Sequence, residues 1–207
     1  MTPPLLSLAS VTCTRGGLVV LSDVTFDVAP GEAIILKGPN GSGKTTLLRT
    51  IAGLQPLSSG QVTGDSEELA YAAHADGIKG QLTVAENLMF WAGLFGLSSI
   101  TPALKAFDLT DLQNRAAQSL SAGQKRRLGL ARMAVTGRKI WLMDEPTVSL
   151  DAHAVTLFAD CVRAHLADGG AAIIATHIDL GLDARTVDVA QFKPKFIATD
   201  AFDEAFE

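Results

Sequence analysis

The chain has 207 residues, of which 47% are hydrophobic, and it carries a formal net charge of −5. This length suits one large α/β domain, and the hydrophobic content excludes an intrinsically disordered chain. The acidic balance argues against sequence-independent affinity for nucleic acid, so we expect no nucleic-acid partner.

The first residues, Met1–Pro4, lack the basic start and the apolar stretch of a signal peptide. No apolar run approaches the roughly 20 residues that a membrane-spanning helix needs. We therefore expect a soluble protein whose connection to a membrane runs through a partner. The two cysteines, Cys13 and Cys161, lie far apart and outside any CxxC pair, which indicates reduced thiols in a cytosolic chain.

The predicted strands begin with two apolar, β-branched segments. Residues 5–13 and 18–28 flank Gly16 and Gly17, and this pattern predicts a hairpin-like pair of strands. The next apolar run, residues 33–37, is short and unbroken, which is typical of a buried parallel strand.

A glycine-rich loop follows this strand, and residues 46–52 then have helical spacing. Strand, glycine loop and helix are the usual opening of a parallel α/β sheet. Two later apolar runs predict further buried strands, residues 140–143 ending at Asp144 and residues 171–176 ending at His177. Open α/β sheets bind their ligands at such carboxyl ends of strands.

The rest of the chain is consistent with a single domain over residues 1–207. Residues about 82–137 have a helical pattern, and residues about 198–207 are acidic and weakly patterned, which indicates a surface helix or a frayed tail. The chain contains no internal repeat, low-complexity tract or linker.

The loop Gly38–Thr45 reads GPNGSGKT and fits the phosphate-binding pattern G-x-x-x-x-G-K-[ST] between a strand and a helix. Its glycines let consecutive backbone N–H groups point at phosphate oxygens, and the following helix adds the positive end of its dipole. Lys44 can reach the β- and γ-phosphates of ATP or GTP, and the Thr45 hydroxyl can ligate Mg²⁺. The predicted nucleotide-binding residues here are Gly38, Pro39, Asn40, Gly41, Ser42, Gly43, Lys44, Thr45 and Thr46.

An acidic pair, Asp144 and Glu145, closes the strand predicted over residues 140–143. Asp144 is placed to hold a magnesium ion together with Thr45. Glu145 is placed to orient or deprotonate the attacking water.

A second motif, Leu120–Gln124, reads LSAGQ and is followed by Lys-Arg-Arg. Here the chain resembles the ABC ATPase family, whose signature is LSGGQ before a basic helix, and Ala122 replaces the middle glycine. The resemblance covers about residues 5–192. It implies a P-loop NTPase of the ABC ATPase type, an α/β fold with a mainly parallel sheet core, an antiparallel β subdomain and a helical subdomain. It also implies ATP and Mg²⁺ as cofactors.

In this family the signature caps the γ-phosphate of ATP held by the opposing subunit. Ser121, Gly123, Gln124 and the helix that follows would form this second anion site. The resemblance therefore implies an ATP-sandwich dimer of two copies. It also implies that His177 is the switch histidine, which senses the γ-phosphate and supports Glu145, and that Asp151 lies in a subunit-contact loop.

Two positions depart from the family pattern. His74 stands where many members have a glutamine that reaches toward Mg²⁺ and the membrane subunit. Imidazole can still hydrogen-bond a water there. Arg15 stands where an aromatic residue often stacks on adenine, and it is either a stacking guanidinium or a solvated turn residue.

The stretch 77–88, GIKGQLTVAENL, resembles the ATP-binding subunits of the haem exporter of bacterial cytochrome c maturation. This resemblance implies integral-membrane partner subunits, a peripheral location at the cytoplasmic face of the bacterial inner membrane, and ATP-driven haem transport or release of a haem-loaded chaperone. No CxxCH is present, so we expect that the chain does not bind haem directly. The apolar run 89–97 is either helical core or a contact with the membrane partner.

Three alternatives remain open from the sequence. They are the ATPase of an exporter for another substrate, a soluble ABC protein that acts on ribosomes or DNA, and a P-loop kinase. The soluble class usually has two nucleotide domains or long insertions, and a kinase offers no reason for Leu120–Gln124.

Overall fold

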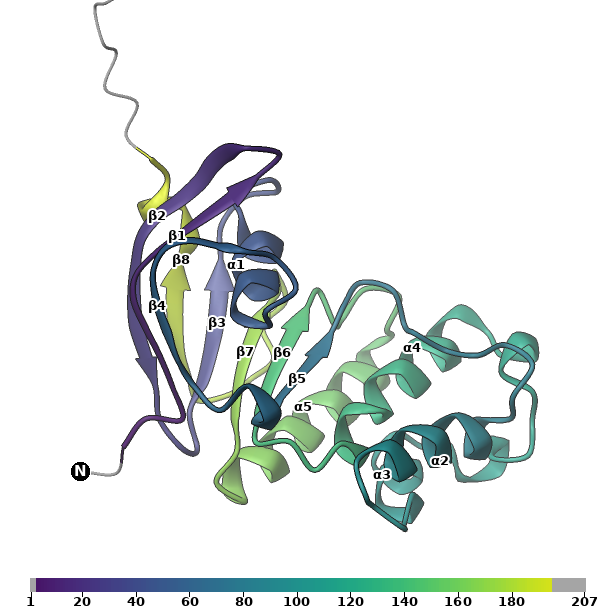
Figure 1. The fold of residues 1–207 in the computed structure, drawn as a ribbon. Coiled ribbons are helices and arrows are strands. Elements are labelled where there is room, and N and C mark those ends of the chain that lie inside the picture. The colour runs from purple at the N-terminus through teal and green to yellow at the C-terminus, as the bar shows by residue number, and fades with distance from the viewer. Residues whose placement is uncertain (1–2, 195–207) are drawn as a thin grey trace, which may run out of the picture.

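A computed structural model describes residues 3–194, and Figure 1 shows the arrangement of its elements. The first, second and fourth strands of the chain form an antiparallel sheet in the order β2-β1-β4. Their bounds are Leu6–Arg15 for β1, Leu18–Val28 for β2 and Leu57–Gly64 for β4. The predicted pairing of the first two strands is confirmed, since Arg15 pairs with Leu18 across the turn.

The second sheet has five strands in the order β5-β6-β7-β3-β8, and every neighbouring pair is parallel. The strands are β3 (Ala33–Lys37), β5 (Leu69–Ala72), β6 (Ile140–Asp144), β7 (Ala171–Ala175) and β8 (Ala184–Asp188). The three central strands β3, β6 and β7 are those that the unbroken apolar runs predicted. The sequence analysis did not identify the edge strands β5 and β8, because β5 has only four residues and the residues of β8 are mixed in polarity.

Alternate residues of the central strands belong to two separate hydrophobic clusters. Ile34 and Leu142 pack in one cluster with the antiparallel sheet and α1 (Lys44–Ile51). Ile35 and Trp141 pack in the other, against α5 (Ala152–Ala167) and the helical part of the chain. Because side chains of a strand alternate between faces, the parallel sheet is covered on both sides.

The helical part lies on the right in Figure 1 and contains α2 (Val84–Leu94), α3 (Thr101–Ala106) and α4 (Ala122–Ala131). Short 3₁₀ helices complete the chain, at Ser66–Glu68, Thr110–Leu112, Ala117–Ser119, Met133–Val135 and Val189–Phe192. Helices α2, α3 and α4 and the 3₁₀ helices between Thr110 and Val135 fall within the region 82–137 for which we predicted helix, interrupted by turns and one β-bridge between Thr83 and Ala116. The single-domain boundaries stay a prediction, and the predicted acidic tail lies outside the described residues.

Across residues 3–194, no helix combines the length and the apolar character needed to span a membrane. Cys13 and Cys161 are free thiols in the structure. Burial raises the pKa of Cys161 to about 11, so this thiol stays protonated at neutral pH and is a poor nucleophile.

One histidine is part of the packing between α5 and the sheet. The ring of His165 stacks on Trp141, with ring centroids 3.8 Å apart and planes inclined by 8°. Its Nε2 lies 3.1 Å from the carbonyl oxygen of Lys139. Burial lowers the pKa of His165 from its ordinary value of 6.5, because the charged ring is poorly solvated there.

This lowered pKa predicts a loss of stability in mild acid. Below about pH 6.5 the unfolded chain binds a proton that the folded chain does not, so the free energy of unfolding falls as the pH falls through this range. His165→Phe keeps a ring against Trp141 and removes the titration, and the Lys139 carbonyl still accepts from the N–H of Ala171. The variant should lose less stability than the natural chain between pH 7 and pH 5.5 in urea melts.

A matched control is His153→Gln, which removes an exposed histidine from the same helix. The control should lose as much stability as the natural chain over this pH range. An equal loss in all three proteins would contradict the role of His165.

Candidate active site

The loop after β3 is folded so tightly that two of its glycines cannot be replaced. Gly38 has φ +139°, and a Cβ there would come within 2.7 Å of the Ser42 hydroxyl. Gly43 has φ +105°, and a Cβ there would come within 2.9 Å of Val20 and Leu21 of β2. Only glycine adopts such conformations without strain and allows so close an approach. The loop therefore delivers the chain directly into α1, whose N-cap is Gly43.

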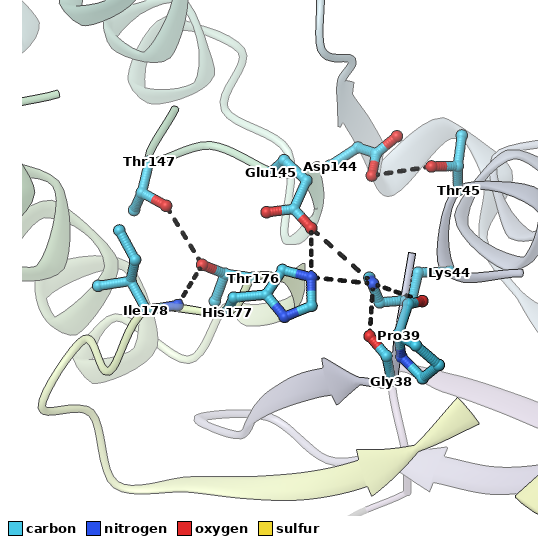
Figure 2. Close-up of polar contacts among 10 residues, drawn as sticks. All are labelled: Gly38, Pro39, Lys44, Thr45, Asp144, Glu145, Thr147, Thr176, His177 and Ile178. Carbon is cyan, nitrogen blue, oxygen red and sulfur yellow. Dashed lines mark hydrogen bonds and ion pairs between the residues drawn. The ribbon is translucent and has the colours of Figure 1, made fainter. Parts of the chain in front are cut away.

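Lys44, the first residue of α1, turns its ammonium group back over this loop, as Figure 2 shows. Its Nζ donates to the carbonyl oxygens of Gly38 at 2.8 Å and Pro39 at 3.4 Å. The side chain is only 7% exposed. A buried cation held by two carbonyls at the mouth of a phosphate loop is available to exchange those contacts for phosphate oxygens.

The three residues that the sequence analysis predicted to be catalytic lie together (Figure 2). The Nε2 atom of His177 lies 3.3 Å from the Nζ atom of Lys44 and 3.6 Å from the Oε1 atom of Glu145. The distance from Lys44 Nζ to Glu145 Oε1 is 4.0 Å. They come from the start of α1 and from the ends of β6 and β7, so the sheet brings distant parts of the sequence to one point.

The turn that carries His177 is held by two threonine hydroxyls. Thr176 is completely buried, and its Oγ1 lies 3.2 Å from that of Thr147. The same oxygen accepts from the N–H of Ile178 at 3.2 Å. These contacts fix the backbone on both sides of His177 and thereby the direction of its ring.

Glu145 adopts a left-handed backbone conformation, with φ +48°. For a residue other than glycine this costs about 1–3 kcal/mol and persists only where the surroundings enforce it. Here the N–H of Glu145 donates to the carbonyl oxygen of Ala175 in β7 at 2.9 Å, and its own carbonyl accepts from Arg126 at 2.7 Å. The strained position of the acidic residue is thus held from both sides.

The predicted magnesium ligands are only partly brought together. The Thr45 hydroxyl donates to Oδ1 of Asp144 at 3.2 Å, and a hydroxyl beside a carboxylate suits the oxygen preference of Mg²⁺. His74 lies two residues beyond β5 and is exposed. Within residues 3–194, no hydrogen bond joins its side chain to Thr45 or Asp144.

The candidate magnesium site has few protein ligands. The described residues hold no group of three or more histidine, cysteine or acidic side chains around one point. Mg²⁺ is usually bound by one or two protein ligands, water and the substrate phosphates, so the Thr45–Asp144 pair fits this ion.

A cavity of ≈ 260 Å³ opens beside the phosphate loop and includes Arg15 from the end of β1. Its other walls are Val20, Glu145 and residues 40–46 of the loop and the start of α1. The structure therefore places Arg15 next to the predicted phosphate site. Sequence reasoning missed Val20, because nothing in a strand of valines and leucines marks the residue that lines this cavity.

The residues of the signature motif, Leu120–Gln124, do not lie at this cavity. Ser121 is the N-cap of α4, and it forms a reciprocal capping box with Gln124. Gly123 lies close to the carbonyl of Ser149. Figure 1 shows α4 in the helical part, away from α1, and none of these three signature residues lines the cavity beside the loop. Asp151 caps α5 by accepting from the N–H of Ala154 at 2.7 Å.

Sequence reasoning also missed Arg126, which is 4% exposed and donates to the backbone of the Glu145 loop. Three consecutive basic residues, Lys125 to Arg127, are usually a solvated helix face. Their order along the chain does not reveal which of them is buried.

Comparisons with known proteins agree with this geometry. The family model described as ABC transporter matches residues 21–148. The cytochrome c biogenesis ATP-binding export protein CcmA of Roseobacter denitrificans is 62% identical over 97% of this chain and 98% of its own length. The protein of the same name from Paracoccus denitrificans is 55% identical over 98% of this chain and 99% of its own length.

Solved structures have the same fold. A putative ABC transporter ATP-binding protein from Pyrococcus furiosus superposes with a TM-score of 0.82 at 22% identity, over 91% of this chain and 99% of its own. An ATP-binding subunit of an ABC transporter gives a TM-score of 0.77 at 26% identity, over 84% and 80%. The chain belongs to the ABC transporter family, as one of its ATP-hydrolysing subunits.

Proposed function

We propose that this chain is the ATP-hydrolysing subunit of a bacterial cytochrome c biogenesis export system, which powers the transport of haem or the release of a haem-loaded chaperone. The observation that carries the proposal is the convergence of Lys44, Glu145 and His177 at the phosphate loop. The names of relatives that match almost the whole chain support the export system.

In the proposed reaction the loop N–H groups and Lys44 bind the β- and γ-phosphates of ATP. Glu145 orients a water and takes its proton while the water oxygen attacks the γ-phosphorus. The bond from this phosphorus to the bridging oxygen breaks, and ADP leaves. His177, 3.6 Å from the carboxylate, keeps Glu145 in place and contacts the γ-phosphate.

Magnesium is the cofactor that this donor set fits, with Thr45 and Asp144 as its protein ligands. When bound, the ion supplies positive charge that neutralises the phosphate oxygens. His74 stays our candidate for a residue that contacts the water shell of the ion, although its ring is exposed in this structure.

A second copy of the chain completes the site in our proposal. Ser121, Gly123 and Gln124 form the N-terminus of α4, which lies away from the phosphate loop of the same chain. A helix N-terminus binds anions. It would serve the nucleotide of an opposing copy and form the predicted ATP-sandwich dimer.

The exposed side of α2 is our candidate contact with integral-membrane subunits. Leu88 and Ala92 of this helix are buried, whereas Met89, Phe90 and Leu94 are 46–64% exposed. The apolar run 89–97 is therefore part core and part surface, and exposed apolar side chains in a cluster mark contact sites. This contact would hold the chain at the cytoplasmic face of the inner membrane, and we expect the membrane subunits rather than this chain to handle haem.

Glu145→Gln should abolish ATP turnover and leave ATP binding intact, because the amide keeps the shape of the side chain and cannot take a proton. The variant should also accumulate as an ATP-bound dimer on gel filtration. Turnover is measured as phosphate release by the complex purified with its membrane subunits. Lys44→Ala is the contrasting variant, since it should weaken nucleotide binding itself. Normal turnover by Glu145→Gln would show that the assignment of the general base is wrong.

Arg15→Ala should weaken ATP binding about 2- to 30-fold if the guanidinium stacks on adenine, the range expected of cation–π contacts. Arg15→Tyr should restore the affinity, because an aromatic ring also stacks on a base. Binding is measured by titration of the full chain with a fluorescent ATP analogue. Arg115→Ala removes an exposed charge from the helical part and serves as the control. Equal affinities for all four proteins would identify Arg15 as a solvated turn residue.

Deleting the gene should stop covalent haem attachment to periplasmic c-type cytochromes, and the natural chain should restore it. The Glu145→Gln chain should fail to do so, whereas the exposed-site variant His153→Gln should succeed. Attachment is measured by haem staining of denaturing gels. Normal staining in the deletion strain would direct us to an exporter of another substrate and leave the ATPase assignment intact.

A further inference from the structure

The guanidinium of Arg126 joins three segments of the chain at one point. On one side, Nε donates to the carbonyl of Pro146 at 2.9 Å and Nη2 donates to the carbonyl of Glu145 at 2.7 Å. On the other side, Nη1 contacts Oδ1 of Asp76 at 2.8 Å. The same nitrogen lies 3.2 Å from the carbonyl of His74 and 3.4 Å from that of Ala73. Arg126 itself belongs to α4.

This arrangement needs an arginine. Its planar fork places donors in fixed directions, so that two consecutive carbonyls are bound on one edge and a carboxylate on another. A lysine ammonium is a single point of charge and cannot span both edges. The side chain is 5% exposed, and that of Asp76 is 28% exposed, so little water is available to replace a lost donor.

The contact with Glu145 is the one that bears on catalysis. Glu145 has φ +48°, and its N–H is bound to β7. The carbonyl oxygen of Glu145 accepts a hydrogen bond from the side chain of Arg126. A backbone held in a strained conformation relaxes when one of the groups that enforce it is removed. The carboxylate would then move relative to the γ-phosphate.

We propose that Arg126 is a positioning residue for hydrolysis, which ties the segment 73–76 after β5 to the backbone of Glu145. The inference rests on the proposed role of Glu145 as general base. Arg126 would touch neither the nucleotide nor the attacking water, and would act through the placement of the Glu145 carboxylate.

The close packing around Asp76 indicates that its ion pair with Arg126 is held in one position. A Cβ at Gly129 of α4 would come within 2.9 Å of the Asp76 side chain, and a Cβ at Gly77 would come within 2.3 Å of Arg132. The guanidinium of Arg132 in turn lies 4.7 Å from the ring centroid of Trp91 in α2. The segment 73–77 therefore lies against α4, and α4 lies against the helix whose outer side we propose as the membrane contact.

The decisive experiment compares Arg126→Lys with Arg127→Lys in the complex purified with its membrane subunits. Arg126→Lys should lower kcat about 10- to 100-fold, the effect expected when a reacting group is misplaced by about 1 Å. Its affinity for ATP should stay within about twofold of the natural value, because no atom of Arg126 lines the phosphate cavity. The kcat value is referred to the fraction of protein that binds ATP, so that partial unfolding does not count as lost catalysis.

Arg127→Lys is the matched control. Arg127 is on the same helix, is also largely buried, and also donates to two backbone carbonyls and an aspartate, namely those of Phe107 and Asp108. None of these partners belongs to the Glu145 loop. This variant should keep kcat within about twofold, since it loses anchoring contacts of the same kind without moving Glu145.

A double-mutant cycle with Asp76→Asn tests the second half of the proposal. Asp76→Asn should also lower kcat, and the double variant Arg126→Lys with Asp76→Asn should be no slower than Arg126→Lys alone, because both changes break one linkage. Additive losses would show that segment 73–76 is not tied to Glu145 through Arg126.

Two results would overturn the role of Arg126 itself, namely a normal kcat in Arg126→Lys or an equal loss in both lysine variants. Glu145→Gln, measured beside them, separates this inference from the proposed function. If Glu145→Gln is active, the general-base assignment fails. If it is inactive while Arg126→Lys is normal, only the positioning role fails.

Discussion

The register of the three central strands is the constraint on which the site depends. Leu36 of β3 and Asp144 of β6 both pair with Ala175 of β7, so the three strands end in one row. Beyond that row the chain continues into the phosphate loop, Glu145 and His177, respectively. Because a parallel ladder allows no slip without breaking every pair, the three segments that carry the proposed catalytic residues leave the sheet at neighbouring points. The hydrogen bond from Glu145 N–H to Ala175 extends this row by one residue.

The two hydrophobic clusters make this register rigid. Side chains on one face of the sheet pack with α1 and the antiparallel sheet, and those on the other face pack with α5 and the helical part. The phosphate loop lies between β3 and α1, and its Gly43 lies against β2. The antiparallel sheet therefore shapes the loop by contact, although it contributes only Arg15 and Val20 to the cavity wall. The stacked Trp141–His165 pair closes the opposite side of the sheet.

The helical part has a different relation to the site. Its signature helix α4 presents Ser121 to an outer surface, while its Arg126 reaches inward to the loop of Glu145. One helix thus carries a residue proposed for the nucleotide of an opposing copy and a residue that binds the backbone of Glu145, the proposed general base of its own chain. The segment 73–77 lies between this helix and the sheet. A movement of the helical part would therefore be transmitted to Glu145 by a small number of contacts.

Local pattern by itself determined the central strands, the phosphate loop, the acidic pair and the signature motif. Apolar runs and a glycine-rich loop are local properties, and their spacing already specifies a strand, a turn and the start of a helix. The sequence did not predict the edge strands β5 and β8, because β5 is only four residues long and β8 is mixed in polarity with one buried residue.

Only the tertiary structure decided which charged and small residues matter around these motifs. Lys125, Arg126 and Arg127 are alike in the sequence, and the fold alone buries Arg126 against Glu145 and Asp76. It likewise placed Arg15 beside the loop, and left His74 exposed. The physical reason is that a buried donor is defined by the acceptors around it, and these come from segments that are distant in the chain.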